Sequence, residues 1–365
     1  MKLVFINSAR DWGGAEGWSA YFCTGMAERG HTVTFICHPR AELYHRLESD
    51  PSVELAPVRI RGELDPIRVY QLARLFRRNA PDVIVTYRTR DTKLAVVAQY
   101  LAGGFPLVQA HKAPYPLRDT PLYRFLWTRG VRAIATSSIR NREMLIRHAT
   151  WLSQIPIRVI YNGVDIDHFR PRPESRAEVR AELGIPDSAF VVSYHGRIES
   201  RKQVDVMIDA VIAAASREAV HGIFLGSGPQ LSELRERVER LAAPVTLTGF
   251  REDVPRLLGA ADAAMHLSIS DTLPHSVLEA MACGLPVVVS DEPSHREQIH
   301  HGEHGLVVPP GQPEAAAQAI LELAHAPPRR AQMSAAARQR AVAEFNRLRM
   351  VEGYESFLEE LLAEG

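Results

Sequence analysis

The sequence has 365 residues, a length that favours two domains. Hydrophobic residues make up 46% and charged residues 24%, which is ordinary for a folded protein and excludes disordered, collagen-like and coiled-coil chains. The 43 basic and 43 acidic side chains cancel, so the average charge argues against a nucleic-acid-binding protein.

Short apolar runs alternate with longer segments of helical periodicity in the first part of the chain. The predicted helices are Gly17–Arg29, Ile67–Arg78 and Thr92–Leu101. The predicted strands are Leu3–Ile6, Thr32–Cys37, Asp82–Val85, Leu107–Ala110, Ile134–Thr136 and Val159–Tyr161. Continuous apolar strands separated by helices indicate a parallel sheet that is covered on both faces.

A stretch rich in proline and charge over residues 165–187 is typical of a linker, and a second alternating series follows it. Its predicted strands are Phe190–Tyr194, Gly222–Leu225, Val245–Leu247, Ala263–Leu267, Pro286–Ser290 and Gly305–Val308. Its predicted helices are Val204–Ser216, Leu231–Leu241, Val277–Cys283 and Glu314–His325, before a helix-rich tail over Ala331–Leu362. The sequence therefore predicts two α/β domains, each a doubly wound parallel sheet that binds ligands at the carboxyl ends of its strands.

The cysteines and the N-terminus indicate the compartment. Cys23, Cys37 and Cys283 are too few and too scattered for a disulfide framework or a zinc site. No apolar run approaches the roughly 20 residues of a membrane span, and the first residues are too short an apolar run for a signal peptide. We therefore expect a cytoplasmic protein.

Two glycines, Gly13 and Gly14, separate the first strand from the first helix. Such a turn lets the backbone approach a ligand, and the helix N-terminus favours an anionic group there. A plain tight turn is the alternative. The turn lacks the G-x-G-x-x-G pattern of dinucleotide-binding proteins, which disfavours a nicotinamide-dependent oxidoreductase.

The second series opens with a strand followed by Gly196, Arg197 and Lys202. Two cations at the carboxyl end of a strand suit a diphosphate, because arginine binds its oxygens bidentately and lysine acts as a point charge. A solvated charged loop is the alternative. Later glycine turns that contain Gly228 and Phe250 place further backbone at the same edge of the sheet.

Asp271 and Glu279 lie eight residues apart, the first in a loop and the second inside a predicted helix. The backbone N–H groups at the start of that helix, from His275 to Val277, can hold a phosphate. Glu279, one to two turns further on, can accept hydrogen bonds from vicinal hydroxyls.

This segment resembles the E-x7-E motif of the family-4 glycosyltransferases in its usual setting of E-A-M-A-C-G-x-P-V-V. Other elements of the family follow in order along almost the whole chain. They are the glycine loop Gly13–Glu16, the inter-domain signature Tyr161–Asp165 with Phe169 and Pro171, Gly196 and Arg197 with Lys202, and the late turn with Gly302, Gly305 and Val308–Gly311.

The resemblance implies the GT-B fold, with two Rossmann-like domains that face a central cleft. Residues 1–168 with a final helix over 350–365 would bind the acceptor, and residues 169–349 would bind the nucleotide-sugar donor. The implied activity is retaining transfer of a hexose-type sugar to a glycan or lipid-linked acceptor, without a metal or another cofactor. A UDP-sugar is favoured over a GDP- or ADP-sugar.

The resemblance also implies a role for each matching residue. Arg197 and Lys202 would stabilise the charge of the leaving diphosphate, Asp271 would contact the hydroxyls of the donor sugar, and His111 would lie near the reacting centre. The donor-binding residues would be Gly13, Gly14, Gly196, Gly228, Phe250, His275, Ser276, Val277 and Glu279. The residues on the acceptor side would be Glu16, Arg88, Lys112 and Arg118.

One position departs from the family pattern, because Asp271 replaces the first glutamate of the motif and Thr272 replaces the usual glycine. The shorter side chain changes the reach of the carboxylate toward the donor sugar. A catalytically inactive, glycosyltransferase-like binding subunit is therefore the alternative function.

The zero net charge hides an asymmetry between the two halves. Residues 1–170 carry 24 Lys and Arg against 15 Asp and Glu, and the remainder carries 19 against 28. The basic half predicts an anionic acceptor, or contact with the anionic inner face of the cytoplasmic membrane. Basic and aromatic residues are densest from Lys112 to Arg147, and a solvated helix face is the alternative there. The placement of Arg88, Arg90, Asp91 and Lys93 after strand Asp82–Val85, together with the segment Ala113–Arg118, resembles bacterial family-4 enzymes that build lipopolysaccharide or other surface glycans.

Overall fold

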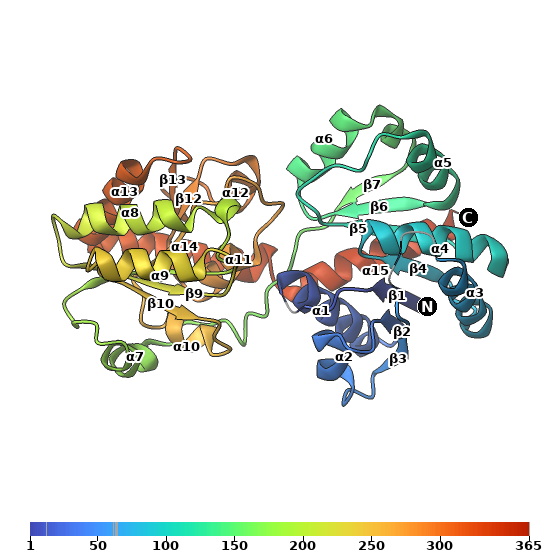
Figure 1. The fold of residues 1–365 in the computed structure, drawn as a ribbon, viewed down its shortest axis with the longest axis horizontal. Coiled ribbons are helices and arrows are strands. Elements are labelled where there is room, and N and C mark those ends of the chain that lie inside the picture. Colours follow the sequence, from blue (N-terminus) through green and yellow to red (C-terminus); the bar gives the residue numbers. More distant parts are fainter. Residues whose placement is uncertain (12, 61, 63–64, 365) are drawn as a thin grey trace. The chain divides into compact units, whose positions relative to one another are not determined.

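The computed structural model of the chain describes residues 1–11, 13–60, 62 and 65–364, and the chain divides into two compact units (Figure 1). Unit 1 comprises Met1–Gly163 together with the chain from Arg347 on, and unit 2 comprises Val164–Asn346. The chain passes between the units a few residues before the positions predicted from the sequence, 168 and 349.

In the described part of unit 1, seven parallel strands lie in the order β3-β2-β1-β4-β5-β6-β7. The strands are β1 Lys2–Asn7, β2 Thr32–Cys37, β3 Val53–Pro57, β4 Val83–Thr86, β5 Leu107–His111, β6 Ala133–Thr136 and β7 Ile157–Val159. The helices are α1 Gly14–Glu28, α2 Glu42–Leu47, α3 Pro66–Asn79, α4 Thr89–Ala102, α5 Pro121–Gly130, α6 Ile139–His148, the short 3-10 helix η1 Thr150–Gln154, and α15 Arg347–Ala363.

Both faces of this sheet are covered, as the alternation along β1 shows. Val4 and Ile6 pack into a core with α3, α4 and α5, whereas Leu3 and Phe5 pack into a second core with α1, α2 and α15. Strands buried on both faces read as continuous apolar runs, which is why the sequence revealed them.

The last helix of the chain, α15, packs against α1 in unit 1, although the two helices are far apart in the sequence (Figure 1). Gly25 allows this contact, because a Cβ atom there would lie 2.6 Å from Val351. Tyr354 meets the rings of Trp18 and Phe22 edge-on, at centroid distances of 5.5 and 5.1 Å.

In unit 2, six described parallel strands lie in the order β10-β9-β8-β11-β12-β13. The strands are β8 Phe190–His195, β9 Val220–Leu225, β10 Val245–Gly249, β11 Ala263–His266, β12 Val287–Ser290 and β13 Gly305–Val308. The α-helices are α7 Arg176–Glu182, α8 Val204–Ala215, α9 Leu231–Arg240, α10 Val254–Leu258, α11 His275–Ala282, α12 Pro293–Gln298, α13 Pro313–His325 and α14 Pro327–Glu344. The 3-10 helices are η2 Pro173–Ser175 and η3 Ser200–Lys202.

The prediction of two doubly wound α/β units is confirmed, and the main differences concern short elements. The sequence analysis missed the strand β3 and the helices α2, α5, α6, α7, α10 and α12, each of which has ten residues or fewer. The strand predicted over Val159–Tyr161 is β7, which ends at Val159 because its pairing with β6 ends there. Within the described residues, no helix is both long and apolar enough to cross a membrane.

Candidate active site

The carboxyl ends of β8 and β11 lie side by side in unit 2, since these strands pair directly. The loop after β8 carries Arg197 and leads into η3, which ends at Lys202. The loop after β11 carries Asp271 and leads into α11. The topology therefore brings the predicted diphosphate cations and the E-x7-E-like segment to one edge of one sheet.

Lys202 and Asp271 form a buried ion pair at this edge. The Lys202 ammonium donates to both carboxylate oxygens of Asp271, at 2.9 and 2.7 Å. Arg201 donates to the first oxygen at 2.8 Å, and His266 lies 3.0 Å from the second. Burial alone would raise the pKa of Asp271, but Lys202 and His266 hold it well below its ordinary range.

His266, at the end of β11, connects this ion pair to the start of α11. Burial and the nearby Lys202 cation lower the pKa of His266 to about 3, so the imidazole is neutral. A neutral ring that faces the Asp271 carboxylate through Nε2 donates there, which leaves Nδ1 as an acceptor. The Ser276 hydroxyl, 3.2 Å from Nδ1, is then the donor to this nitrogen.

Glu199 extends the charged network toward solvent. Its carboxylate lies 2.7 Å from Arg201 and 3.5 Å from Arg197. The Arg197 side chain is 62% exposed, whereas that of Lys202 is only 10% exposed. The two residues predicted to bind the diphosphate therefore differ in their surroundings: Lys202 is held in a buried ion pair, and Arg197 is mostly exposed to solvent.

The glycine turns at this edge allow the loops to pack backbone against backbone. The Gly196 N–H donates to the Leu225 carbonyl at 3.0 Å, and the Ile198 N–H donates to the Ser227 carbonyl at 3.0 Å. A Cβ atom at Gly228 would lie 2.1 Å from the Ile198 carbonyl oxygen. These contacts fix the loop that carries the cations. Phe250, in the turn after β10, exposes 59% of its surface at the same edge.

The first turn of α11 presents the backbone N–H groups predicted for phosphate binding. The helix begins at His275 after Pro274, whose side chain makes no capping hydrogen bond. The backbone N–H groups of a first helical turn and the helix dipole both favour an anion at such an end. Glu279, further along α11, accepts a hydrogen bond from His195 at 2.7 Å.

In unit 1, the predicted acceptor residues lie in different environments. Gly13 precedes the first turn of α1, and a Cβ atom at Gly13 would lie 3.4 Å from the Glu16 carboxylate. Burial raises the pKa of Glu16, although the nearby Arg88 opposes this shift. Arg88 and Arg118 are exposed.

His111 and Lys112, at the end of β5, are both buried. Burial lowers the pKa of His111 to about 4, and its Nε2 lies 3.1 Å from the Tyr115 carbonyl oxygen, to which it donates. The Lys112 ammonium donates to Asn162 at 2.8 Å and lies 4.4 Å from the centre of the Trp18 ring. The sequence analysis places Lys112 in the basic region that could meet an anionic partner, but the structure buries this side chain against the aromatic core.

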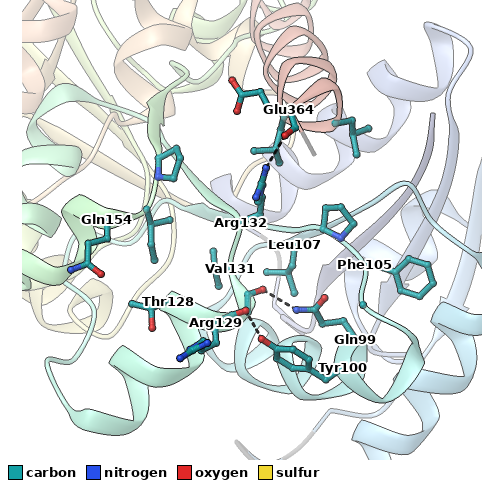
Figure 2. A pocket seen from close by; sticks show the side chains of 17 residues that line it. Gln99, Tyr100, Phe105, Leu107, Thr128, Arg129, Val131, Arg132, Gln154 and Glu364 are labelled. Carbon is teal, nitrogen blue, oxygen red and sulfur yellow. Dashed lines mark hydrogen bonds between the residues drawn. The ribbon is translucent and has the colours of Figure 1, made fainter.

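A cavity of about 760 Å³ lies at the edge of the unit 1 sheet that is formed by the amino ends of its strands. Figure 2 shows the side chains that line it. It lies where β5, β6 and β7 begin, and its walls include Tyr100, Arg129, Arg132 and the end of α15. Tyr100 donates to the Arg129 carbonyl oxygen, and Arg132 lies 3.5 Å from the Glu364 carbonyl oxygen. The residues that line this cavity include none of the site residues predicted from the sequence, although Arg129 and Arg132 belong to the basic region that was predicted to meet an anionic partner.

Each of the two units contains a segment that matches a known protein family. Residues 12–168 match the family described as Glycosyltransferase Family 4, and residues 175–340 match the one described as Glycosyl transferases group 1. The chain belongs to the family-4 glycosyltransferases. The residues of the unit 2 network thus lie within the segment shared with known glycosyltransferases.

This glycosyltransferase is similar to enzymes that are named for lipopolysaccharide core biosynthesis and for transfer to a diphosphoundecaprenol-linked sugar. It is 27% identical over 359 residues to the lipopolysaccharide core biosynthesis glycosyltransferase LpsE of Rhizobium meliloti (strain 1021), covering 97% of this chain and 98% of the relative. It is 23% identical over 277 residues to the UDP-Gal:alpha-D-GlcNAc-diphosphoundecaprenol alpha-1,3-galactosyltransferase of Escherichia coli, covering 71% of each chain.

The solved structure of Anabaena Alr3699/HepE in complex with UDP and glucose has a similar fold. The match has a TM-score of 0.82 at 23% identity and covers 99% of this chain and 100% of the other. With two parallel-sheet α/β units, the glycosyltransferase has the GT-B fold, as the resemblance implied.

The sequence analysis missed several polar residues of this site. His195, His266, Glu199 and Arg201 contact the predicted residues, yet none was singled out. His195 and His266 each end a strand in the structure, and position at the carboxyl end of a buried strand is the signal that marks them.

Proposed function

We propose that this glycosyltransferase moves a hexose from a nucleotide sugar to an anionic glycan or lipid-linked acceptor, with retention of anomeric configuration. The proposed role is in bacterial lipopolysaccharide or cell-surface polysaccharide synthesis, at the cytoplasmic face of the membrane. The names of the Rhizobium and Escherichia relatives support this class of acceptor, and the UDP complex of the Anabaena protein supports UDP as the nucleotide.

The observation that carries the proposal is the convergence of complementary groups at one edge of unit 2. Lys202 and Arg197 supply positive charge, the N-terminus of α11 supplies N–H groups, and Glu279 supplies a carboxylate. A nucleoside diphosphate needs these three kinds of group, for its phosphates and for its ribose hydroxyls.

Breaking the bond between sugar and phosphate leaves negative charge on the diphosphate, and stabilising that charge is the main catalytic requirement. Lys202 does this from a fixed position, because Asp271 holds its ammonium at 2.7 Å. Arg197 closes over the diphosphate from its exposed position. Because Lys202 and Arg201 already neutralise Asp271, this carboxylate is a poor ligand for a divalent cation, and the proposed reaction uses none.

Asp271 contacts the donor sugar in this proposal, in the place of the first glutamate of the motif. Each of its oxygens already accepts from Lys202, and each has a second polar neighbour. A carboxylate has about four lone-pair directions, so a sugar hydroxyl shares Asp271 with these donors. Asp271 thereby contacts both the donor sugar and the Lys202 ammonium, which in this proposal binds the diphosphate.

The acceptor binds at the carboxyl edge of the unit 1 sheet. Exposed arginines follow several neighbouring strands there, namely Arg10 after β1, Arg40 after β2, Arg59 after β3, and Arg88 after β4. Arginine binds phosphate and carboxylate groups bidentately. This edge therefore favours an acceptor that carries phosphate or another anionic group.

In this proposal, unit 1 contacts an anionic membrane through the outer faces of α3 and α5. Neither helix contains an acidic residue. Both pack on the same face of the sheet, and their exposed large hydrophobic side chains are Ile67 and Tyr70 on α3, and Leu122 and Phe125 on α5. Apolar and aromatic side chains interleaved with arginine are typical of surfaces that enter the headgroup region of a bilayer.

A panel of nucleotide sugars tests the donor assignment. We expect UDP and a UDP-hexose to raise the melting temperature of the purified protein more than GDP- or ADP-sugars do. Turnover of the preferred donor should be lost in Glu279→Ala while the circular dichroism spectrum is unchanged. Binding without any turnover, even with membrane lipid extracts as acceptor, would instead support an inactive binding subunit.

Co-sedimentation with vesicles tests the membrane assignment separately. We expect binding to equimolar phosphatidylglycerol and phosphatidylcholine vesicles, and weak binding to phosphatidylcholine alone. The double variant Leu122→Ala/Phe125→Ala should lower the bound fraction severalfold. Leu241→Ala, which removes an equally exposed leucine from unit 2, is the matched control. Equal binding by the double variant and the control would refute this surface.

A further inference from the structure

His195 and Glu279 form a hydrogen bond that joins the central part of the unit 2 sheet to α11. The His195 Nε2 atom lies 2.7 Å from the Glu279 Oε2 atom. The residues are 84 positions apart in the sequence. The bond therefore exists only because the fold brings the end of β8 beside α11.

His195 is a rigid partner. It is the last residue of β8, a strand that pairs with β9 on one side and β11 on the other. Its Cα pairs in register with Leu225, and the side chain is buried. The imidazole consequently holds its position whether or not a ligand is present.

The Glu279 carboxylate, in contrast, has no fixed orientation of its own and depends on a hydrogen-bond partner for it. A glutamate side chain has three rotatable bonds, so ordering it costs conformational entropy. The terminal torsion of the carboxylate is broad, so it does not orient itself. The bond to His195 fixes Oε2, whereas Oε1 accepts no hydrogen bond from any residue that the structure describes, and the side chain remains 23% exposed.

We propose that His195 is a positioning residue for nucleotide recognition, holding Glu279 so that its second carboxylate oxygen accepts hydrogen bonds from the vicinal ribose hydroxyls. The inference rests on the proposed function, because it takes the nucleotide to bind at this edge of unit 2. It adds a residue whose effect is selective: His195 acts on the ribose and leaves the diphosphate contacts unchanged.

This selectivity predicts a specific signature in binding. A site that is preorganised to hydrogen-bond a hydroxyl discriminates strongly against the analogue that lacks it. If His195 orients Glu279, its loss weakens the binding of UDP and affects 2′-deoxy-UDP much less. A residue that merely supports the fold would weaken both nucleotides equally.

Calorimetric titration with UDP and 2′-deoxy-UDP measures this ratio directly. For the wild type we expect UDP to bind at least tenfold more tightly than 2′-deoxy-UDP. In His195→Leu the ratio should fall to below threefold, chiefly through weaker UDP binding. His195→Gln, whose amide N–H can replace the Nε2 donor, should recover most of the ratio.

A double-variant comparison separates positioning from general damage. In a Glu279→Ala background, adding His195→Leu should produce no further loss of UDP affinity, because the carboxylate that His195 orients is no longer present. An unchanged ratio in a folded His195→Leu protein that still binds UDP would overturn the inference and leave the proposed function standing. Failure of the wild type to bind any nucleotide would overturn both.

Discussion

The Lys202 ammonium lies 2.7 Å from the Asp271 carboxylate, in a site where both side chains are about nine-tenths buried. The pair crosses between the loops that follow β8 and β11. It fixes a cation where the leaving diphosphate is proposed to lie, and it supplies the anion that makes burial of that cation tolerable. Changes at these two residues therefore have different consequences.

Replacing Lys202 with methionine removes the fixed cation while keeping the length of the side chain. We expect turnover to fall at least 100-fold, as is typical when one stabilising donor is removed. Arg201 and His266 still contact Asp271, so the free energy of unfolding should fall by less than the roughly 3–5 kcal/mol typical of a buried charge without a partner. Steady-state kinetics and urea denaturation measure the two effects.

The control for this variant is Arg217→Met, which removes an exposed cation from a loop elsewhere in unit 2. It should leave both turnover and stability nearly unchanged. Turnover of Lys202→Met within threefold of the wild type would show that this ammonium has no part in the reaction.

Replacing Asp271 with asparagine removes the negative charge but keeps the shape of the side chain. We expect UDP to bind as tightly as in the wild type or more tightly, since the positive charge of Lys202 is no longer neutralised. Turnover should nevertheless fall at least tenfold, because the sugar loses its carboxylate contact. Calorimetry and kinetics together check this split, and weaker UDP binding with unchanged turnover would contradict it.

Arg180 is a structural cation in unit 2 and gives a prediction about stability alone. It is fully buried and donates to Asp262 at 2.8 Å and to the carbonyl oxygens of Ala189 and Ala260. We expect Arg180→Met to lower the free energy of unfolding by about 3–5 kcal/mol, because these acceptors lose their partner. Denaturant titration followed by circular dichroism measures this change.

A neighbouring arginine provides the matched control for Arg180. Arg176 contacts the same carboxylate of Asp262 at 2.8 Å, but its side chain is 39% exposed. Exposed ion pairs contribute about 0–1 kcal/mol, so Arg176→Met should be nearly neutral. Equal effects of the two substitutions would show that burial does not determine the contribution of these arginines.

Two buried histidines predict how stability depends on pH. Burial lowers the pKa of His111 to about 4 and, with Lys202, lowers that of His266 to about 3, from an ordinary value of 6.5. Below pH 6.5 the unfolded chain takes up protons that the folded protein does not. Stability is therefore complete above pH 6.5 and falls as the pH drops toward 4, by up to about 1.4 kcal/mol per pH unit for each histidine.

Urea denaturation at pH 7, 6 and 5 measures this slope. His111→Gln should reduce the slope by the share of one histidine, because glutamine does not titrate. A slope that is the same in the variant and the wild type would show that His111 does not stay neutral in the folded protein.

The sequence predicted the parts of this protein that local patterns determine. Strands such as Leu3–Ile6 are apolar on both faces, and the loop from Gly196 to Lys202 carries its charges in one short segment, so both were visible without a structure. The pairing of His195 with Glu279 was not visible, because it joins residues 84 positions apart. Only the order of the strands in unit 2 brings them together.

The basic half of the chain shows a second limit of sequence reasoning. Lys112 and Lys93 both lie in this basic half, yet both are buried against aromatic rings, those of Trp18 and Tyr123. The composition shows that these side chains are charged, but it does not show whether they point into the core or toward solvent. The exposed arginines of the same region carry the proposal of an anionic acceptor, and the buried lysines do not.

Time-resolved proton NMR of the purified protein with a UDP-hexose and membrane lipid extract tests the central claim most directly. The account predicts that the anomeric signal of the donor decays while UDP forms, and that the first product signal has the same anomeric configuration as the donor. It also predicts that both changes disappear in Lys202→Met. A product of inverted configuration would contradict retention, and unchanged turnover in the variant would contradict the assigned site.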